Sequence, residues 1–149
     1  TPGNEVPVSL QVENVIIDGN IGAITEVYSL NIFTGSSFLT SAIEINAIQD
    51  IYFLGPVNFQ PPPGFTLRIT TNGALSFVND IIATEIVEID SPNFFIYQTF
   101  SGPRLDIIFT STVILFDASL STNLRLLDAS SLIGTGTISE LTVIDDFTS

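Results

Sequence analysis

Short runs of alternating apolar and polar residues recur along this sequence, and they constrain the fold more than any other feature. The clearest run spans residues 6–12, where the apolar positions are Val6, Val8, Leu10 and Val12. A period of two residues is typical of a β-strand that buries one face. Ile, Val, Thr and Phe are frequent in these runs and favour strands over helices. The pattern therefore predicts an all-β protein.

The spacing of the runs indicates how the strands are arranged. Gly- and Pro-containing turns separate them, which predicts about nine or ten short strands. The chain has 149 residues, a length that suits one domain with a sizeable core. Some runs, such as residues 104–109, carry apolar residues on both faces and predict strands covered on both sides. We expect a single-domain antiparallel β-sandwich or jelly roll, with the body over residues 20–149 and an N-terminal extension strand within residues 1–19.

Two local patterns refine this expectation. The Asn72-Gly73 pair lies between two alternating runs and predicts a hairpin over residues 65–79, because a type I′ turn needs positive φ at both central positions. A short echo relates residues 115–120 to residues 126–132. A solenoid needs roughly three or more repeats, so two copies favour a pair of similar turns over a repeat fold.

The run at residues 6–12 has the features of an edge strand. Pro7 cannot donate a ladder hydrogen bond, so this strand pairs on one side only or lies at the edge of a sheet. It is either an edge strand of the chain's own sheet or a strand donated to a neighbouring copy. In the second case the inserted side chains are Val6, Val8, Leu10 and Val12. Repeated head-to-tail donation builds an open filament, and the arrangement resembles donor-strand-assembled surface fibres in general architecture.

The composition excludes several classes of chemistry. The chain has no Cys, His, Lys, Met or Trp, and its only cationic side chains are Arg68, Arg104 and Arg125. A Ser or Thr nucleophile therefore lacks an activating base, and thiolate and Schiff-base chemistry are absent. We predict that the chain is not an enzyme. The net charge of −13 also argues against binding to nucleic acid, and no apolar run is long enough for a membrane-spanning helix.

Carboxylates are the abundant reactive groups and leave one candidate cofactor, calcium. Calcium takes about six to eight oxygen ligands, many of them carboxylates. The EF-hand pattern is absent, so such a site is irregular. The candidate ligands are Asp80, Glu88, Asp90, Asp145 and Asp146. A solvated acidic surface is the alternative interpretation of these residues.

Together these features predict a structural protein. We expect a subunit of an extracellular filament or surface assembly that polymerises by donating its N-terminal strand, so its partners are copies of itself. The low share of charged residues and the start at Thr1 favour an extracellular or cell-surface location after removal of an N-terminal signal. Two alternatives stay open: a secreted adhesin or carbohydrate-binding module using Tyr28, Tyr52 or Tyr97, and a virion coat or decoration protein.

Overall fold

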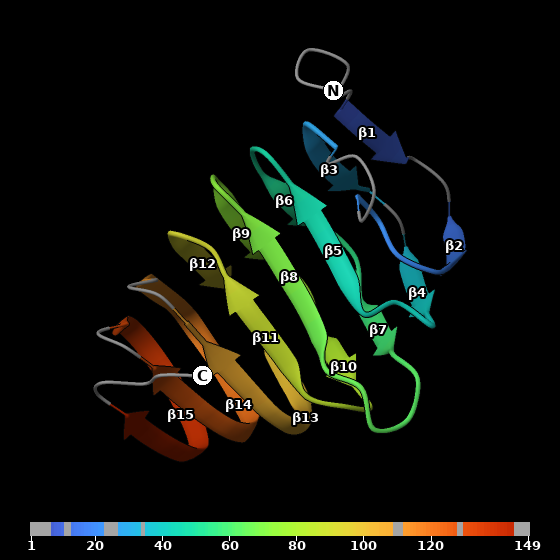
Figure 1. Cartoon of the computed structure of the whole chain (residues 1–149). Coiled ribbons are helices and arrows are strands. Elements are labelled where there is room, and N and C mark those ends of the chain that lie inside the picture. The colour runs from blue at the N-terminus through green and yellow to red at the C-terminus, as the bar shows by residue number, and fades with distance from the viewer. Residues whose placement is uncertain are drawn as a thin grey trace.

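The strands of this protein wind into a parallel β-solenoid of about 6 turns (Figure 1). The computed structural model describes residues 7–10, 13–22, 27–33, 35–108, 112–127 and 130–144. Each full turn of the solenoid is called a coil below. The strands are β1 (Pro7–Leu10), β2 (Asn14–Asp18), β3 (Ser29–Ile32), β4 (Ser36–Thr40), β5 (Glu44–Ala47), β6 (Ile51–Phe53), β7 (Val57–Gln60), β8 (Leu67–Thr71), β9 (Ala74–Phe77), β10 (Ile81–Ala83), β11 (Val87–Asp90), β12 (Asn93–Ile96), β13 (Thr99–Ile107), β14 (Thr112–Leu127) and β15 (Ser131–Ile144).

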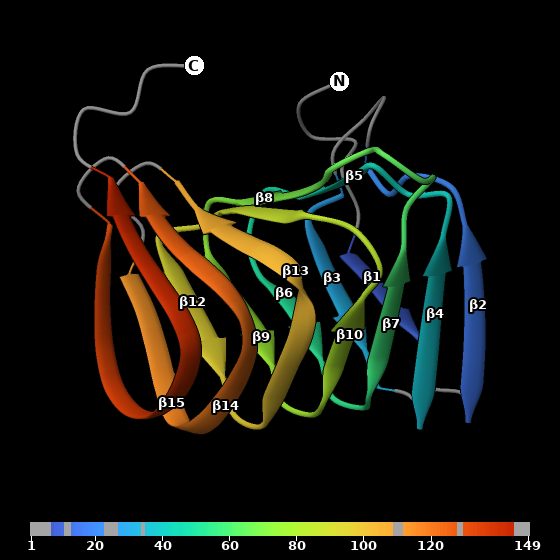
Figure 2. The same ribbon diagram turned by 90° about the horizontal axis from the view of Figure 1, so that it is seen from below.

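The solenoid has three faces, and a complete coil contributes one stretch of strand to each (Figure 2). The first face contains β1, β3, β6, β9 and β12, followed by the first parts of β14 and β15. The second face contains β2, β4, β7 and β10, then the start of β13 and the middle of β14 and β15. The third face contains β5, β8 and β11, then the ends of β13, β14 and β15.

The number of residues in a coil varies along the chain. The Ala74 backbone N–H donates to the Asp50 carboxylate, 24 residues earlier, whereas the Ser131 hydroxyl donates to that of Thr112, only 19 residues earlier. Extra residues are accommodated at the corners, as in the Pro61–Gly64 segment between β7 and β8. The strands therefore stay stacked in register although successive coils differ in length.

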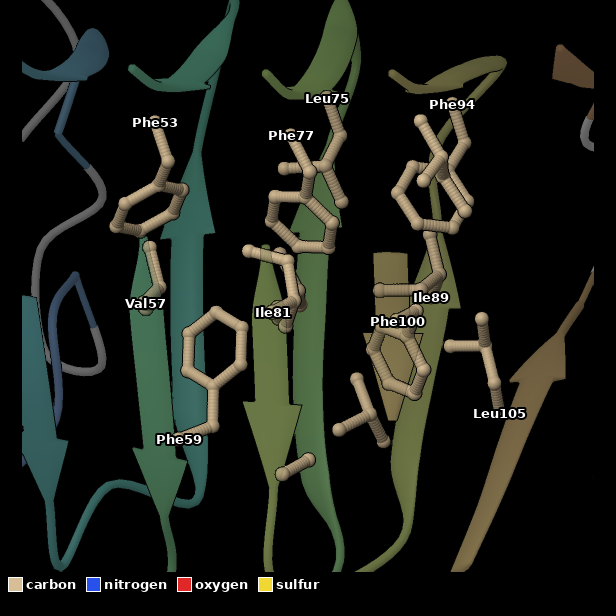
Figure 3. Close-up of a cluster of buried hydrophobic side chains, with 14 of the residues drawn as sticks. Phe53, Val57, Phe59, Leu75, Phe77, Ile81, Ile89, Phe94, Phe100 and Leu105 are labelled. Atoms are coloured by element: carbon tan, nitrogen blue, oxygen red, sulfur yellow. The ribbon is translucent and has the colours of Figure 1, made fainter. Parts of the chain in front are cut away.

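The core is a set of inward-facing columns in which side chains from successive coils stack on one another (Figure 3). The Phe77 ring is central, with centroid distances of 5.8 Å to Phe53, 5.8 Å to Phe59 and 5.2 Å to Phe94. All four rings are fully buried. The alternation in the sequence thus has its expected physical cause, because every second residue of each strand points into this core.

The all-β class is confirmed, but the predicted antiparallel β-sandwich or jelly roll is wrong. Every strand pair among the described residues is parallel. A period of two residues records that one face of a strand is buried, and it carries no information on the direction of the neighbouring strand. The rejection of a solenoid was also wrong, because the coils repeat apolar character at the inward-facing positions and do not repeat residue identity.

The predicted hairpin over residues 65–79 is wrong for a related reason. β8 lies on the third face and β9 on the first, so Asn72 and Gly73 turn a corner of the solenoid. The φ angle of Gly73 is not in the left-handed region. Glycine is needed at this position because the backbone passes very close to the preceding coil. A Cβ at this position would overlap the Asp50 carboxylate and lie 2.9 Å from the Gln49 carbonyl carbon.

The described residues contain no helix with the length and apolar character needed to cross a bilayer.

Candidate functional site: the two ends of the solenoid

At each end of the described solenoid, the strands pair on one side only with other described strands. Among the described residues, β1 and β2 pair with β3 and β4 respectively, and β15 pairs with β14. β15 is long, with 14 residues from Ser131 to Ile144. An open strand edge carries a row of backbone N–H and C=O groups that are ready to pair with another strand. The ends are therefore the places where further β-structure can be added.

The C-terminal end exposes side chains at core positions. Leu141 and Val143 are 48% and 62% exposed, although their register partners Leu124 and Leu126 in β14 are buried. Their exposure follows from their place in the last described coil, with no later described coil stacked on them. Leu132 and Ile138 of β15 are partly buried and pack against the core. This end is thus an apolar cross-section through the core.

The N-terminal end has the same character. Val8, Leu10, Ile17 and Ile21 are partly buried and pack against the core from the first coil.

The columns also connect the two ends. Successive register partners of Val8 lead along the first face to Leu132. Those of Ile21 lead along the third face to Val143. The two ends therefore carry apolar side chains at equivalent positions.

This geometry bears on the predicted subunit interface. Val8 and Leu10 lie in β1, which pairs with β3 of the same chain, while Val6 and Val12 lie outside the described residues. Donation of the strand to a neighbour stays a prediction. Sequence reasoning missed the C-terminal end, although Leu141 and Val143 alternate with Glu140 and Thr142 as in a strand. Nothing in that alternation shows that the strand is the last one in a stack.

The predicted calcium ligands are distributed over different parts of the solenoid. Glu88 and Asp90 share the third face, where carboxylate oxygens lie 3.8 and 3.4 Å from Arg68 nitrogens. Asp80 precedes β10 on the second face and accepts a 2.7 Å hydrogen bond from the Thr99 hydroxyl. Asp145 and Asp146 lie outside the described residues. Within the described part of the chain, no three acidic side chains are grouped as a metal site would require.

The third face also gathers all three arginines. Asp106, whose side chain is only 6% exposed, lies between two of them. Arg104 Nε donates to Asp106 Oδ1 over 3.0 Å, and Arg125 Nε lies 3.1 Å from the same oxygen without forming a hydrogen bond. The cations are thus used in ion pairs within the fold, which supports a structural role for this cluster.

Replacing Asp106 by asparagine is expected to lower the free energy of unfolding by about 1–3 kcal/mol, because it removes the carboxylate that compensates two partly buried guanidinium groups. Chemical denaturation measures the change. Glu88→Gln is the matched control, since Glu88 faces the more exposed Arg68 at a longer distance and should cost less than about 1 kcal/mol. Equal losses in the two variants would contradict this assignment.

The tyrosines proposed for a glycan site contact other rings. The Tyr97 ring stacks on Phe116 with a centroid distance of 4.6 Å and an interplanar angle of 5°. The Tyr52 ring is 5.5 Å from that of Phe33, while Tyr28 is exposed just before β3. Sugar rings stack on free aromatic faces, and a stacked pair leaves fewer of them. The glycan-binding alternative stays a prediction.

Comparisons with known proteins add no further constraint: no family model matches the chain, and neither a curated protein nor a solved structure matches it significantly.

Proposed function

We propose that this chain is a structural subunit that assembles head to tail into a filament, with the C-terminal end of one copy stacked on the N-terminal end of the next. The observation that carries the proposal is the match between the two open ends. Within the described residues, one core column runs from Ile21 to Val143 and another runs from Val8 to Leu132. A second copy placed on β15 would continue both columns and the parallel ladder.

Burial of apolar surface favours this contact. Fully covering a Leu or Val side chain contributes about 1.5–3 kcal/mol, and Leu141 and Val143 are both about half exposed or more. Pairing of β15 with a new strand adds backbone hydrogen bonds along the same edge. The contact joins two different surfaces, so it leaves a free end after each addition and leads to an open filament.

The N-terminal strand has a defined part in this arrangement. β1 keeps its pairing with β3 and offers its other edge to β15 of the neighbouring copy. Val8 and Leu10 then contact the neighbour without β1 leaving its own sheet. This differs from donation of the entire strand, although both arrangements place the same residues at the subunit contact.

The net charge sets the conditions for assembly. A charge of −13 per copy opposes close approach, and salt screens this repulsion. High ionic strength therefore favours stacking. The low share of charged residues and the abundance of Ser and Thr support an extracellular location for such an assembly.

A disulfide ladder tests the stacking directly, because the chain contains no cysteine of its own. In the variant Val8→Cys/Leu132→Cys, the two thiols lie at opposite ends of one subunit but on adjacent strands, about 4.8 Å apart, across a stacked contact. That separation lies within the usual Cα range of a disulfide, roughly 4.4–6.8 Å. Oxidation at high salt should give dimers, trimers and longer species on a non-reducing gel.

The single variants Val8→Cys and Leu132→Cys are the controls, because each can form dimers at most. Circular dichroism checks that all three proteins keep their β-structure. If the double variant forms no species longer than a dimer at any salt concentration, head-to-tail stacking is wrong.

A further inference from the structure

We infer that Asn72 is a site of spontaneous deamidation that the fold keeps closed, so that the modification occurs when the corner between β8 and β9 opens. Asn72 is the only asparagine in the sequence that precedes a glycine. Because glycine has no Cβ, its backbone nitrogen is accessible to the preceding side chain in an open chain. The inference is independent of head-to-tail assembly and concerns the lifetime of the folded subunit.

The reaction needs water and no catalyst, and asparagine is among the residues that limit the thermal lifetime of proteins. The Gly73 backbone nitrogen gives up its proton and bonds to Asn72 Cγ. The side-chain amide leaves as ammonia with that proton, and a succinimide ring remains. Water then adds across either carbonyl–nitrogen bond of the ring. Opening at Cγ gives aspartate, whereas opening at the main-chain carbonyl gives isoaspartate, in which the chain continues through Cβ and Cγ.

In the folded chain, the attacking nitrogen is engaged in hydrogen bonds. The Gly73 N–H donates to the Thr71 hydroxyl oxygen over 3.1 Å and to the Gln49 carbonyl oxygen over 3.3 Å. Both acceptors hold the proton that must leave, and amide resonance keeps the lone pair of the nitrogen delocalised. Thr71 is only 2% exposed, so its hydroxyl is shielded from competing water.

The rest of the corner is fixed as well. The Ser91 hydroxyl donates to the Gly73 carbonyl over 3.2 Å, and the Ala74 N–H donates to the Asp50 carboxylate over 2.8 Å. The glycine also lies directly against the backbone of the preceding coil, with no room for a Cβ. Attack requires this peptide to turn toward the asparagine side chain. These contacts must therefore break first, which is a local opening of the coil.

The tightness of this corner determines what deamidation does to the fold. Only Asn72 and Gly73 separate β8 from β9. Each strand is held on both sides, β8 by β5 and β11 and β9 by β6 and β12. Isoaspartate adds a methylene group to the backbone of a corner that already touches the preceding coil. The two strands then cannot both keep their register, so a reversible opening becomes permanent.

Mass spectrometry measures the modification. The protein is incubated at one mildly alkaline pH, either folded in buffer or unfolded in concentrated urea, and is then digested with trypsin. Cleavage after Arg68 and Arg104 releases a peptide that contains Asn72, Asn79 and Asn93, and fragmentation locates each amide that has become a carboxyl. We expect Asn72 to react fastest of the three in urea. In the folded protein it should react at least about tenfold more slowly, because only the open fraction reacts.

Two variants on β8 test whether the hydrogen bonds close the site. Thr71→Val removes the hydroxyl that accepts from Gly73, so deamidation of the folded protein should accelerate. Thr70→Val is the matched control, because it makes the same change on the opposite side of the same strand and should leave the rate unchanged. In urea both variants should react at the rate of the unmodified protein. Circular dichroism checks that both variants are folded in buffer.

Equal rates at Asn72 in the folded and unfolded protein would overturn the inference, as would a faster reaction at Asn79 or Asn93 in urea. An unchanged rate in folded Thr71→Val would show that the hydroxyl does not close the site and would overturn the assignment of the gate. Protein modified in urea is finally returned to buffer. The isoaspartate-containing fraction should stay unfolded, and its return to the native circular dichroism spectrum would contradict a permanent opening.

Discussion

Replacing Phe77 by alanine is expected to lower the free energy of unfolding by about 3–5 kcal/mol, the range for losing a fully buried aromatic side chain. The Phe77 ring contacts Phe53, Phe59 and Phe94, which come from the coils on both sides of it as well as from the second face. Its removal leaves a cavity that strands held by stacked neighbours cannot close. Because coils stabilise one another through nearest-neighbour contacts, a defect at the centre weakens both halves of the stack.

Urea or guanidinium denaturation followed by circular dichroism measures this loss. Phe116→Ala is the matched control, because that ring is 45% exposed and its main contact is the stack on Tyr97. The control should cost about 0.5–1.5 kcal/mol. A loss for Phe77→Ala no larger than that of the control would mean that the aromatic columns do not hold the coils together.

Replacing Leu141 by lysine is expected to abolish head-to-tail assembly while leaving the fold intact. Leu141 faces the core side of the last described coil but is 48% exposed, so a lysine there can extend into water in an isolated subunit. In a stacked pair the same lysine would be buried against an apolar end without a partner, which costs several kcal/mol. Lysine also lowers the net negative charge, so a loss of assembly cannot arise from added repulsion.

Light scattering and electron microscopy at high salt measure assembly of the Leu141→Lys variant. Ser139→Lys is the control, because Ser139 is exposed, belongs to the same strand and follows Ile138, which packs against the core. This variant should assemble as the unmodified protein does. Assembly of Leu141→Lys at the same salt and protein concentration would show that the C-terminal end is not a subunit contact.

The sequence predicted the strands better than the way they are assembled. Alternation in residues 6–12 and 65–79 correctly located strands, because burial of every second side chain is common to parallel and antiparallel sheets. The direction of pairing depends on contacts between residues about 20 positions apart, and the alternation within a single strand does not record them. A signal was present in the C-terminal half, where Phe94, Val113 and Leu132 occupy equivalent positions. These residues share hydrophobicity but not identity.

The candidate site was predicted in part. Pro7 indicated an edge strand, and among the described residues β1 pairs only with β3; Val8 and Leu10 pack against the core from the first coil. Leu141 and Val143 were missed, because only the stacking order shows that their strand is the last described. The ion pairs of Glu88 and Asp90 could not be predicted from the sequence. Arg68 lies close to both carboxylates only because β8 and β11 stack on one another in the fold.

The unequal length of the coils has a consequence for the divergence of such chains. Residues inserted at a corner, as in the segment Pro61–Gly64, leave the flanking strands in the same columns. Selection can therefore act on loop length almost independently of the core. Descendants of a common ancestor would accumulate gaps at the corners and exchanges among apolar residues inside. Their common ancestry would be easier to recognise by comparing backbone structures than by aligning their sequences.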